Sequence, residues 1–398
     1  MTDRIRTLLL EANGTHWAAV ALDTVGQGLF TARDNAPRFI TSSPILRKLF
    51  ADRYADASYM ADWREAFCAS DQLAVTVCNI TNLLEFRAHR RTIETYDLIV
   101  VLHSAAGDRM GILNRRAHWF HERRGKLAVF VGNEYDLMDE KISFINESGA
   151  DYVCTQLPID VARSLYATCT ATVLPMPHAL NPRVYNVVPG QARTVDVGFV
   201  GDLYDRLIGD QERTRIVEFI ARDGASHGLR CDVRRQRMPR AEWARYLNSC
   251  HGVVGAESGT YFLQRNGQAL RCAKAAIKQK PDASFDEVFE RCFAHTAPVL
   301  NGKAISSRHF EPIGTRTCQL LVAGTYNGIL EPDRHYIAVD RDLSNIEDAV
   351  RRFKDVACRA RITSLAYEHA IERHTYDRRI ADFVDAVRAG ARPAVLNN

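Results

Sequence analysis

Short apolar runs alternate with longer amphipathic stretches along the first half of the chain. The stretches at 61–69 and 159–166 carry their apolar residues at helical spacing, and the segment 44–50 has the same pattern. Buried strands that alternate with helices are typical of βαβ units in a parallel sheet covered on both faces. The runs that predict strands are residues 7–12, 73–80, 97–103, 126–133, 151–156 and 172–176.

The alternation starts again after a change in composition. Residues 181–193 are rich in Pro, Asn, Val and Gly, and we interpret them as a linker. A helix is predicted at 210–221 and mostly helical structure at 345–387. The second series of strands is predicted at 195–200, 229–233, 252–256, 317–323 and 336–339. The sequence therefore predicts an α/β protein of two Rossmann-like, doubly wound domains that face each other across a cleft, with the ligand at the carboxyl ends of the strands.

We place the domain boundaries from these patterns. Residues 1–185 form the first domain, 194–380 the second, and 381–398 a C-terminal helix or tail. A charged amphipathic stretch at about 268–300 is interpreted as a helical insertion in the second domain. It is broken at Pro281 and Asp282, and Ser284 is positioned to cap its second helix.

Composition narrows the class of protein. The 398 residues are 46% hydrophobic and 25% charged, as expected for a soluble globular protein. A net charge of +4 permits an anionic ligand or a peripheral contact with a membrane surface, but it does not indicate nucleic acid as a partner. We find no signal peptide and no membrane span, so we expect a cytoplasmic protein.

The ten cysteines occur singly, with no Cys-x-x-Cys pair. Several lie in apolar strand-like runs, as Cys154 does. We therefore expect reduced, buried thiols, and this spacing argues against a zinc site.

A loop, a short helix and a strand follow one another near residue 301. Ser306 and Ser307 can cap the helix, which places Arg308 at its N-terminus, where free N–H groups favour an anion. Glu311 lies one turn further on, and a Gly-containing turn follows at 324–328. A cation and a carboxylate in this arrangement suit a ligand with phosphate at one end and hydroxyls at the other, such as a nucleotide sugar. Arg308 and Glu311 taken alone also fit an ordinary surface ion pair.

The whole segment resembles the donor-binding region of GT-B glycosyltransferases, in particular the bacterial group with a spore-maturation-type C-terminal domain. The resemblance is strongest over 195–383 and weak over the first half. Gln319 stands where the related Glu-x7-Glu motif of retaining enzymes has its second glutamate, so inversion and retention both stay open. The matching residues are Arg308, Phe310, Glu311, Gly314, Gly324, Gly328, Glu331 and Tyr336.

This resemblance implies a set of donor-binding residues. Glu311 is expected to accept hydrogen bonds from the ribose or the transferred sugar, and Gly201 to face the phosphates. Arg206, Arg213 and Arg215 follow Gly201, and one of them could reach the diphosphate, although a solvated basic helix face is the better explanation for any single one. The full expected set is Gly201, Arg206, Glu257, Arg308, Glu311, Gly324, Thr325, Tyr326, Asn327, Gly328 and Glu331.

Two first-domain residues are candidates for the catalytic base. His103 ends one predicted strand and Glu134 follows the next. An inverting transfer needs such a base to deprotonate the acceptor. Asp340-Arg341-Asp342 superficially matches a metal-binding Asp-x-Asp motif, but we interpret it as a polar turn. We expect no required metal and no cofactor, with the nucleotide sugar as substrate.

The expected activity is transfer of a sugar from a nucleotide-sugar donor to a glycan, a lipid-linked or a small-molecule acceptor, as in polysaccharide biosynthesis. Two alternatives stay open: a nucleotide-sugar 2-epimerase of the same fold, and a non-catalytic GT-B module in a glycan-assembly complex. A dehydrogenase is a poor match, because Gly26 and Gly28 lack a third glycine at Thr31. The sequence does not identify the sugar, the acceptor or the oligomeric state.

Overall fold

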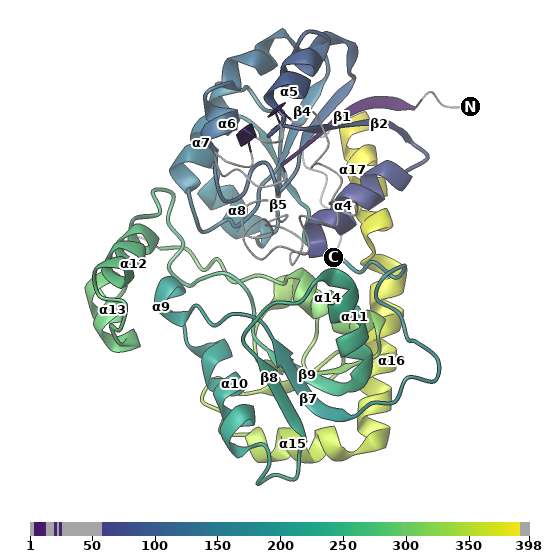
Figure 1. Ribbon diagram of the computed structural model, residues 1–398, viewed down its shortest axis with the longest axis vertical. Helices are drawn as coiled ribbons and strands as arrows, with labels where there is room; N and C mark the ends of the chain where they lie inside the picture. Colours follow the sequence, from purple (N-terminus) through teal and green to yellow (C-terminus); the bar gives the residue numbers. More distant parts are fainter. Residues whose placement is uncertain (1–3, 13–19, 22–23, 26–57, 298, 391–398) are drawn as a thin grey trace. The chain divides into compact units, whose positions relative to one another are not determined.

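In a computed structural model of the chain, the described residues are 4–12, 20–21, 24–25, 58–297 and 299–390 (Figure 1). They fall into two compact units. The first contains the chain up to Thr155, Ala162–Met176 and the residues from Ile380, and the second contains Gln156–Val161 and Pro177–Arg379. The helix predicted at 44–50 and the residues Gly26, Gly28 and Thr31 lie outside the described residues.

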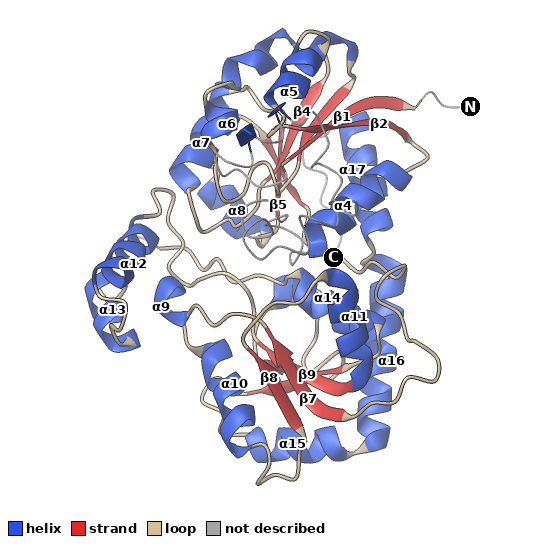
Figure 2. Cartoon of the chain, in the orientation of Figure 1, coloured by secondary structure: helices blue, strands red, loops and turns tan. Residues whose placement is uncertain are grey.

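The first unit is built on a parallel six-stranded sheet with the order β2-β1-β3-β4-β5-β6. Figure 2 shows helices around this sheet. Every residue of β3 is buried, as expected for a strand covered on both faces. The strands are β1 (Ile5–Glu11), β2 (Leu73–Asn79), β3 (Leu98–Val101), β4 (Lys126–Phe130), β5 (Tyr152–Thr155) and β6 (Thr172–Pro175). The helices that belong to this part of the chain are α4 (Ser58–Ala69), α5 (Leu83–Arg90), η1 (Ile93–Thr95), α6 (Gly111–Asn114), η2 (Ala117–Glu122), α7 (Met138–Glu147), α8 (Ile159–Leu165) and α17 (Tyr376–Arg388).

The C-terminal helix α17 packs against the first unit. The ring of Phe383 lies 5.2 Å from that of Phe130 in β4 and 5.8 Å from that of Phe67 in α4. Trp63 completes this aromatic core, with its ring 5.1 Å from Phe130. The last helix of the chain is thus held by residues more than 250 positions earlier, through apolar burial.

The second unit is built on a parallel five-stranded sheet with the order β11-β10-β9-β7-β8. Apolar residues are buried on both of its faces, against α11, α14 and α16 on one side and α10 and α15 on the other. The strands are β7 (Val195–Val200), β8 (Cys231–Arg234), β9 (Cys250–Gly255), β10 (Cys318–Val322) and β11 (Ile337–Val339). The helices are α9 (Asp205–Ile208), α10 (Glu212–Asp223), α11 (Arg240–Ser249), α12 (Gln268–Gln279), α13 (Phe285–Cys292), α14 (Ser307–Gly314), η3 (Tyr326–Gly328), α15 (Ile346–Lys354) and α16 (Val356–Arg373).

The structure confirms the predicted α/β class and the predicted strands. Within the described residues, each apolar run forms a parallel strand, with ends that differ by a few residues; β8, for example, begins at Cys231 rather than at 229. The predicted helical insertion is the α12–α13 hairpin, and Ser284 caps α13 as expected. The Ser284 hydroxyl accepts the Glu287 N–H at 3.2 Å, and the Glu287 carboxylate accepts the Ser284 N–H at 2.8 Å.

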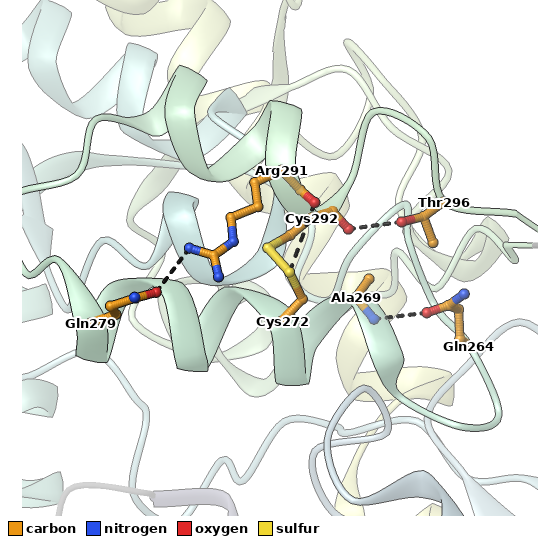
Figure 3. The surroundings of a disulfide bond; sticks show 7 residues. All are labelled: Gln264, Ala269, Cys272, Gln279, Arg291, Cys292 and Thr296. Atoms are coloured by element: carbon orange, nitrogen blue, oxygen red, sulfur yellow. Dashed lines mark hydrogen bonds between the residues drawn. A yellow bond between two sulfur atoms is a disulfide. The ribbon is translucent and has the colours of Figure 1, made fainter.

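The expectation of ten reduced thiols is wrong for one pair. Cys272 in α12 and Cys292 in α13 form a disulfide (Figure 3). The turn between the helices folds α13 back along α12, which brings together two cysteines separated by 20 positions. Single cysteines at this spacing give no sign of pairing, because only the antiparallel packing of two helices joins them.

Among the described residues, the helices are either too short or too polar to cross a membrane.

Candidate functional site

Several expected site residues of the second unit lie at the carboxyl edge of its sheet. Gly201 follows β7, Glu257 follows β9, and the turn 324–328 follows β10. These strands are neighbours, and the chain leaves β7 for β8 on one side and returns to β9 on the other. That reversal is a topological switch point, where open α/β sheets bind ligands outside the carboxyl ends of their strands. Gly201 has a φ of 151°, a backbone conformation that favours glycine.

Helix α14 begins where the sequence predicts. Ser306 precedes it, and the His309 Nδ1 accepts the Ser306 N–H at 2.9 Å. The other ring nitrogen of His309, Nε2, lies 3.1 Å from the carbonyl oxygen of Ala256, just after β9. The His309 ring also lies 5.1 Å from that of Tyr326. His309 therefore ties α14 to both neighbouring loops, a role that the sequence does not reveal.

Arg308 and Glu311 both contact the side chain of Trp243. The Trp243 indole N–H donates to the Glu311 Oε2 at 2.6 Å, and the Arg308 guanidinium lies 4.5 Å from the centre of the Trp243 ring. Arg308 Nε and Glu311 Oε2 are 3.8 Å apart. The Glu311 side chain is 2% exposed and that of Arg308 is 31% exposed, so this is not an ordinary surface ion pair. Arg308 Nη1 is buried and has no hydrogen-bond partner among the described residues.

Gln319 holds α14 from the position where the motif has its second glutamate. Its Nε2 donates to the carbonyl oxygen of His309 at 3.0 Å. Gln319 lies in β10 and is 2% exposed. The amide thus supplies a donor that a carboxylate lacks.

Glu257 fixes the turn that follows β10. Its Oε1 accepts the Tyr326 N–H at 2.6 Å and the Thr325 hydroxyl at 3.1 Å. A Cβ at Gly324 would lie 2.3 Å from Glu257 Oε2, so the close approach requires glycine at this position. Asn327 adds a further restraint, because its Oδ1 accepts the Ile305 N–H at 2.9 Å. The hydrogen bonds of Glu257, Tyr326 and Asn327 thus hold the turn in place, whereas Thr325 and Gly328 are exposed.

The arginines after β7 divide into different roles. Arg206 donates to the carbonyl oxygens of Pro281 at 2.8 Å and Ala283 at 2.7 Å, so its guanidinium holds the α12–α13 hairpin. Arg213 instead lies over the Tyr204 ring at 5.0 Å and donates to the Tyr204 hydroxyl at 2.5 Å. Arg213 Nη2 also lies 3.5 Å from the Glu257 carbonyl oxygen and 3.4 Å from the Ser258 hydroxyl. Arg213 therefore contacts the loops that follow β7 and β9, whereas Arg206 contacts the hairpin.

Cations lie close to the Tyr204 phenol. Burial acts to raise the pKa of the Tyr204 phenol, but the charges of Arg213, Arg237 and Lys303 outweigh it and lower the pKa. Lys303 is itself buried between the carboxylates of Asp210 and Glu212. These carboxylates offset the charge of Lys303, and Asp202 pairs with Arg237 at 3.0 Å.

Glu331 is separate from this arrangement. Its carboxylate accepts two hydrogen bonds from Arg334 Nη1, at 3.0 and 3.1 Å, and both side chains are more than half exposed. This pair orders the loop before β11.

The two candidate bases lie in the first unit. His103 follows β3 and is 1% exposed, enclosed by Tyr59, Trp63 and Phe130. Burial lowers its pKa to about 3, so the ring is neutral at pH 7. Glu134 follows β4 and accepts hydroxyl hydrogen bonds from Thr155 at 2.7 Å and Tyr166 at 2.6 Å. These contacts fix the position of both side chains within the unit.

The sequence pattern did not predict a group of three histidines in the second unit. The rings of His335 and His369 stack with centroids 4.6 Å apart, and His374 Nε2 lies 3.1 Å from His369 Nε2. Arg379 donates to His374 Nδ1 at 2.8 Å. His369 and His374 are five residues apart at the end of α16, and the packing of α16 on the loop before β11 brings His335 to them.

Comparisons with known proteins bear on the fold. No protein-family model matches the sequence, and no curated protein matches it. The structure is similar to that of sucrose-phosphate synthase (tll1590) from Thermosynechococcus elongatus, with 10% identity, 97% of this chain and 99% of that chain covered, and a TM-score of 0.50.

It is equally similar to the DNA-modifying enzyme β-glucosyltransferase, which was solved in the presence and absence of uridine diphosphoglucose. That pair shares 11% identity over 96% of this chain and 99% of the other, with a TM-score of 0.50. Both neighbours are glycosyltransferases of the GT-B class. At this level of identity the likeness concerns the fold, and the fold of this chain is the GT-B fold of two Rossmann-like domains.

Proposed function

We propose that the protein is a metal-independent glycosyltransferase that binds a nucleotide-sugar donor at the carboxyl edge of the second sheet. The observation that carries the proposal is the group formed by Arg308, Glu311 and Trp243 at the start of α14. It combines a buried carboxylate with a guanidinium whose Nη1 lacks a hydrogen-bond partner among the described residues. Such a donor is expected where a ligand completes the site.

The proposed chemistry follows from the charges. A departing nucleoside diphosphate gains negative charge, which Arg308, Arg213 and the N–H groups of α14 can stabilise. Charge-assisted hydrogen bonds are worth about 1.5–3 kcal/mol each. Glu311 would accept hydrogen bonds from the ribose or sugar hydroxyls, and the exposed Thr325 and backbone at Gly328 would lie near the sugar.

The donor and acceptor are proposed by class. A uridine diphosphate sugar is the first donor to test, since uridine diphosphoglucose was used with the β-glucosyltransferase neighbour. The acceptor would be a glycan, a lipid-linked or a small molecule, and the setting polysaccharide biosynthesis in the cytoplasm. The resemblance of residues 301–340 supports the bacterial group with the spore-maturation-type C-terminal domain.

An inverting reaction would need a base. His103 is neutral at pH 7, but the burial that lowers its pKa to about 3 also makes it a weak base, and Glu134 is held by two hydroxyls. We expect His103→Gln to lower kcat more than Glu134→Gln does if the imidazole is the base. The opposite order, with both variants folded, would assign that role to Glu134.

A non-catalytic module is the second candidate. Gln319 favours it, because an amide donor to the His309 carbonyl has replaced a carboxylate of the retaining motif. Such a module would release no nucleoside diphosphate from any donor, in contrast to a transferase.

A thermal-shift screen of nucleoside diphosphates and their sugars tests the proposal. A ligand at a hundred times its Kd should add about 2.7 kcal/mol to the stability of the folded protein. Arg308→Ala should remove the shift, whereas Arg230→Ala, at an exposed ion pair with Asp196, should keep it. Product analysis without acceptor then separates transfer from 2-epimerisation. The absence of any shift across the panel would contradict the proposal.

A further inference from the structure

Three side chains of the kinds that bind transition metals converge in the first unit, outside the site described above. Cys78 lies near the end of β2, and Glu85 and His89 lie on α5. One sulfur, one carboxylate oxygen and one ring nitrogen from these residues all lie within 4.8 Å of one another. Cys78 is 0% exposed, and β2 is an edge strand of the sheet.

The local chain geometry explains why they meet. A tight turn follows β2, in which the Asn79 carboxamide oxygen accepts the Thr81 N–H at 3.1 Å. Asn82 then caps α5, since its Oδ1 accepts the Glu85 N–H at 3.2 Å. Glu85 and His89 are four residues apart and therefore share one helix face. The short turn sets that face beside the end of β2.

Neighbouring side chains hold two of the three groups in place. The Tyr96 hydroxyl lies 3.0 Å from His89 Nδ1, which leaves the other ring nitrogen to bind a cation. Asn82 Nδ2 donates to Glu85 Oε2 at 3.2 Å. Metal-binding imidazoles and carboxylates are oriented by such outer hydrogen bonds. Helix capping accounts for Glu85 and apolar burial for Cys78, but neither accounts for the meeting of all three.

The donor set selects the kind of ion. Mg²⁺ and Ca²⁺ are bound by oxygen atoms, whereas one sulfur, one nitrogen and one oxygen suit Zn²⁺. Zinc is held at about 2.0–2.3 Å by such atoms, so modest rotation of the Glu85 and His89 side chains would complete the contacts. Three protein ligands leave a fourth tetrahedral position for water.

We propose that Cys78, Glu85 and His89 form a zinc-binding site that ties the edge strand β2 to α5. Binding replaces the thiol proton of Cys78 with a sulfur–zinc bond and releases that proton to solvent. The site links β2 to the helix that follows it and so stabilises the first unit. Because the three residues lie on a strand and a helix, paired cysteine spacing in the sequence does not reveal the site.

Metal titration of the full-length protein tests the proposal. The protein is stripped with a chelator and titrated with Zn²⁺ against a coloured competing chelator, and separately with Co²⁺ in an absorption spectrometer. We expect one ion per chain, a melting temperature that rises with Zn²⁺, and a sulfur-to-cobalt charge-transfer band. Cys78→Ser and His89→Gln should each lower the zinc affinity at least ten-fold, and Cys78→Ser should remove the band.

Two further variants test whether zinc binds at these three residues. Cys154→Ser removes a buried thiol in β5 that belongs to no such group of three in the described part of the chain, and it should bind zinc like the parent protein. Glu85→Gln can keep the hydrogen bond with Asn82 but lacks the charged oxygen, so it should fold and bind zinc more weakly. Zinc uptake well below one ion per chain, a cobalt spectrum without the band, or equal affinity in the parent and Glu85→Gln would each overturn the proposal.

Discussion

At the scale of single residues, the candidate donor site depends on Trp243. Its indole N–H and its ring contact two different residues of α14, Glu311 and Arg308. One side chain from α11 thereby sets the positions of a carboxylate and a cation. We classify Trp243 as a positioning residue, since its indole faces these two groups.

Replacement of Trp243 tests this role. Trp243→Phe keeps an aromatic ring for Arg308 but removes the N–H that Glu311 accepts. Loss of one partner of a buried charged group costs about 1–3 kcal/mol, so we expect the donor KM to rise about ten-fold or more. Steady-state kinetics with varied donor measures the effect. Trp119→Phe, at a partly exposed tryptophan in the first unit, serves as the control, and an unchanged KM in Trp243→Phe would contradict the positioning role.

Gly324 provides a second test at this scale. In Gly324→Ala the new Cβ would meet the Glu257 carboxylate, which is held by the Tyr326 N–H and the Thr325 hydroxyl. We expect a loss of about 1–3 kcal/mol in the free energy of unfolding, measured with urea. Gly111→Ala has nothing within 4 Å of its added Cβ and should be neutral or stabilising. Equal stability of the two variants would show that the turn tolerates a side chain.

At the scale of elements, the α12–α13 hairpin has a thin core rich in alanine. Ala269, Ala273 and Ala276 line its inner face, and the Cys272–Cys292 disulfide closes it. A cross-link across a loop of this length is worth about 3 kcal/mol. Arg206 and the α9 segment rest on the hairpin, so the disulfide also supports the loop that follows β7.

The double variant Cys272→Ser with Cys292→Ser should therefore loosen the hairpin. We expect trypsin to cleave faster at the exposed Lys274 and Lys278, as followed by mass spectrometry, because local opening controls cleavage. Cys358→Ser, which removes an unpaired thiol, should leave the cleavage rate unchanged. Identical rates in the double variant and the parent protein would show that apolar packing alone closes the hairpin.

The histidine group of His335, His369 and His374 makes stability depend on pH. Burial lowers the pKa of His374 to about 3 and that of His335 to about 4, and it also lowers the pKa of His369. In the unfolded chain a histidine titrates near 6.5. The unfolded state therefore binds more protons below pH 6.5, and stability falls as the pH decreases from 6.5 towards 4.

Urea unfolding between pH 7 and 5 measures this dependence. The loss should be smaller in His335→Gln, which cannot take up the proton in the unfolded state. His295→Gln changes an exposed histidine and should behave like the parent protein. A free energy of unfolding that is constant over this range would contradict the lowered pKa values.

Elements were also the scale at which sequence reasoning worked best. Strands such as β7 and β10 are short apolar runs with clear ends, and parallel packing on both faces makes them continuous in the sequence. The start of α14 was predictable because Ser306 is a capping residue. The contacts between elements were not predictable from the sequence. Tertiary packing, which local spacing does not encode, brings their neighbours to Trp243, His309 and the second cysteine of the disulfide.

At the scale of the whole molecule, two parallel α/β units account for the GT-B fold. The order of strands in the second sheet places its switch point between β7 and β9, and this topology positions Gly201 and Glu257 together. The strand pattern in the sequence alone predicted that the ligand binds at the carboxyl ends of these strands. It did not predict that Arg206 would serve the hairpin and Arg213 the loops near the site, because the two arginines are alike in their local sequence.

The central claim is that Arg308 and Glu311 bind a nucleotide-sugar donor. Calorimetric titration with the nucleoside diphosphate that stabilises the protein most tests it directly, in the parent protein and in Arg308→Ala, with Arg230→Ala as the control. We predict at least a ten-fold weaker Kd in Arg308→Ala, about 1.4 kcal/mol, and an unchanged Kd in Arg230→Ala. An equal Kd in the parent protein and in a folded Arg308→Ala would contradict the claim.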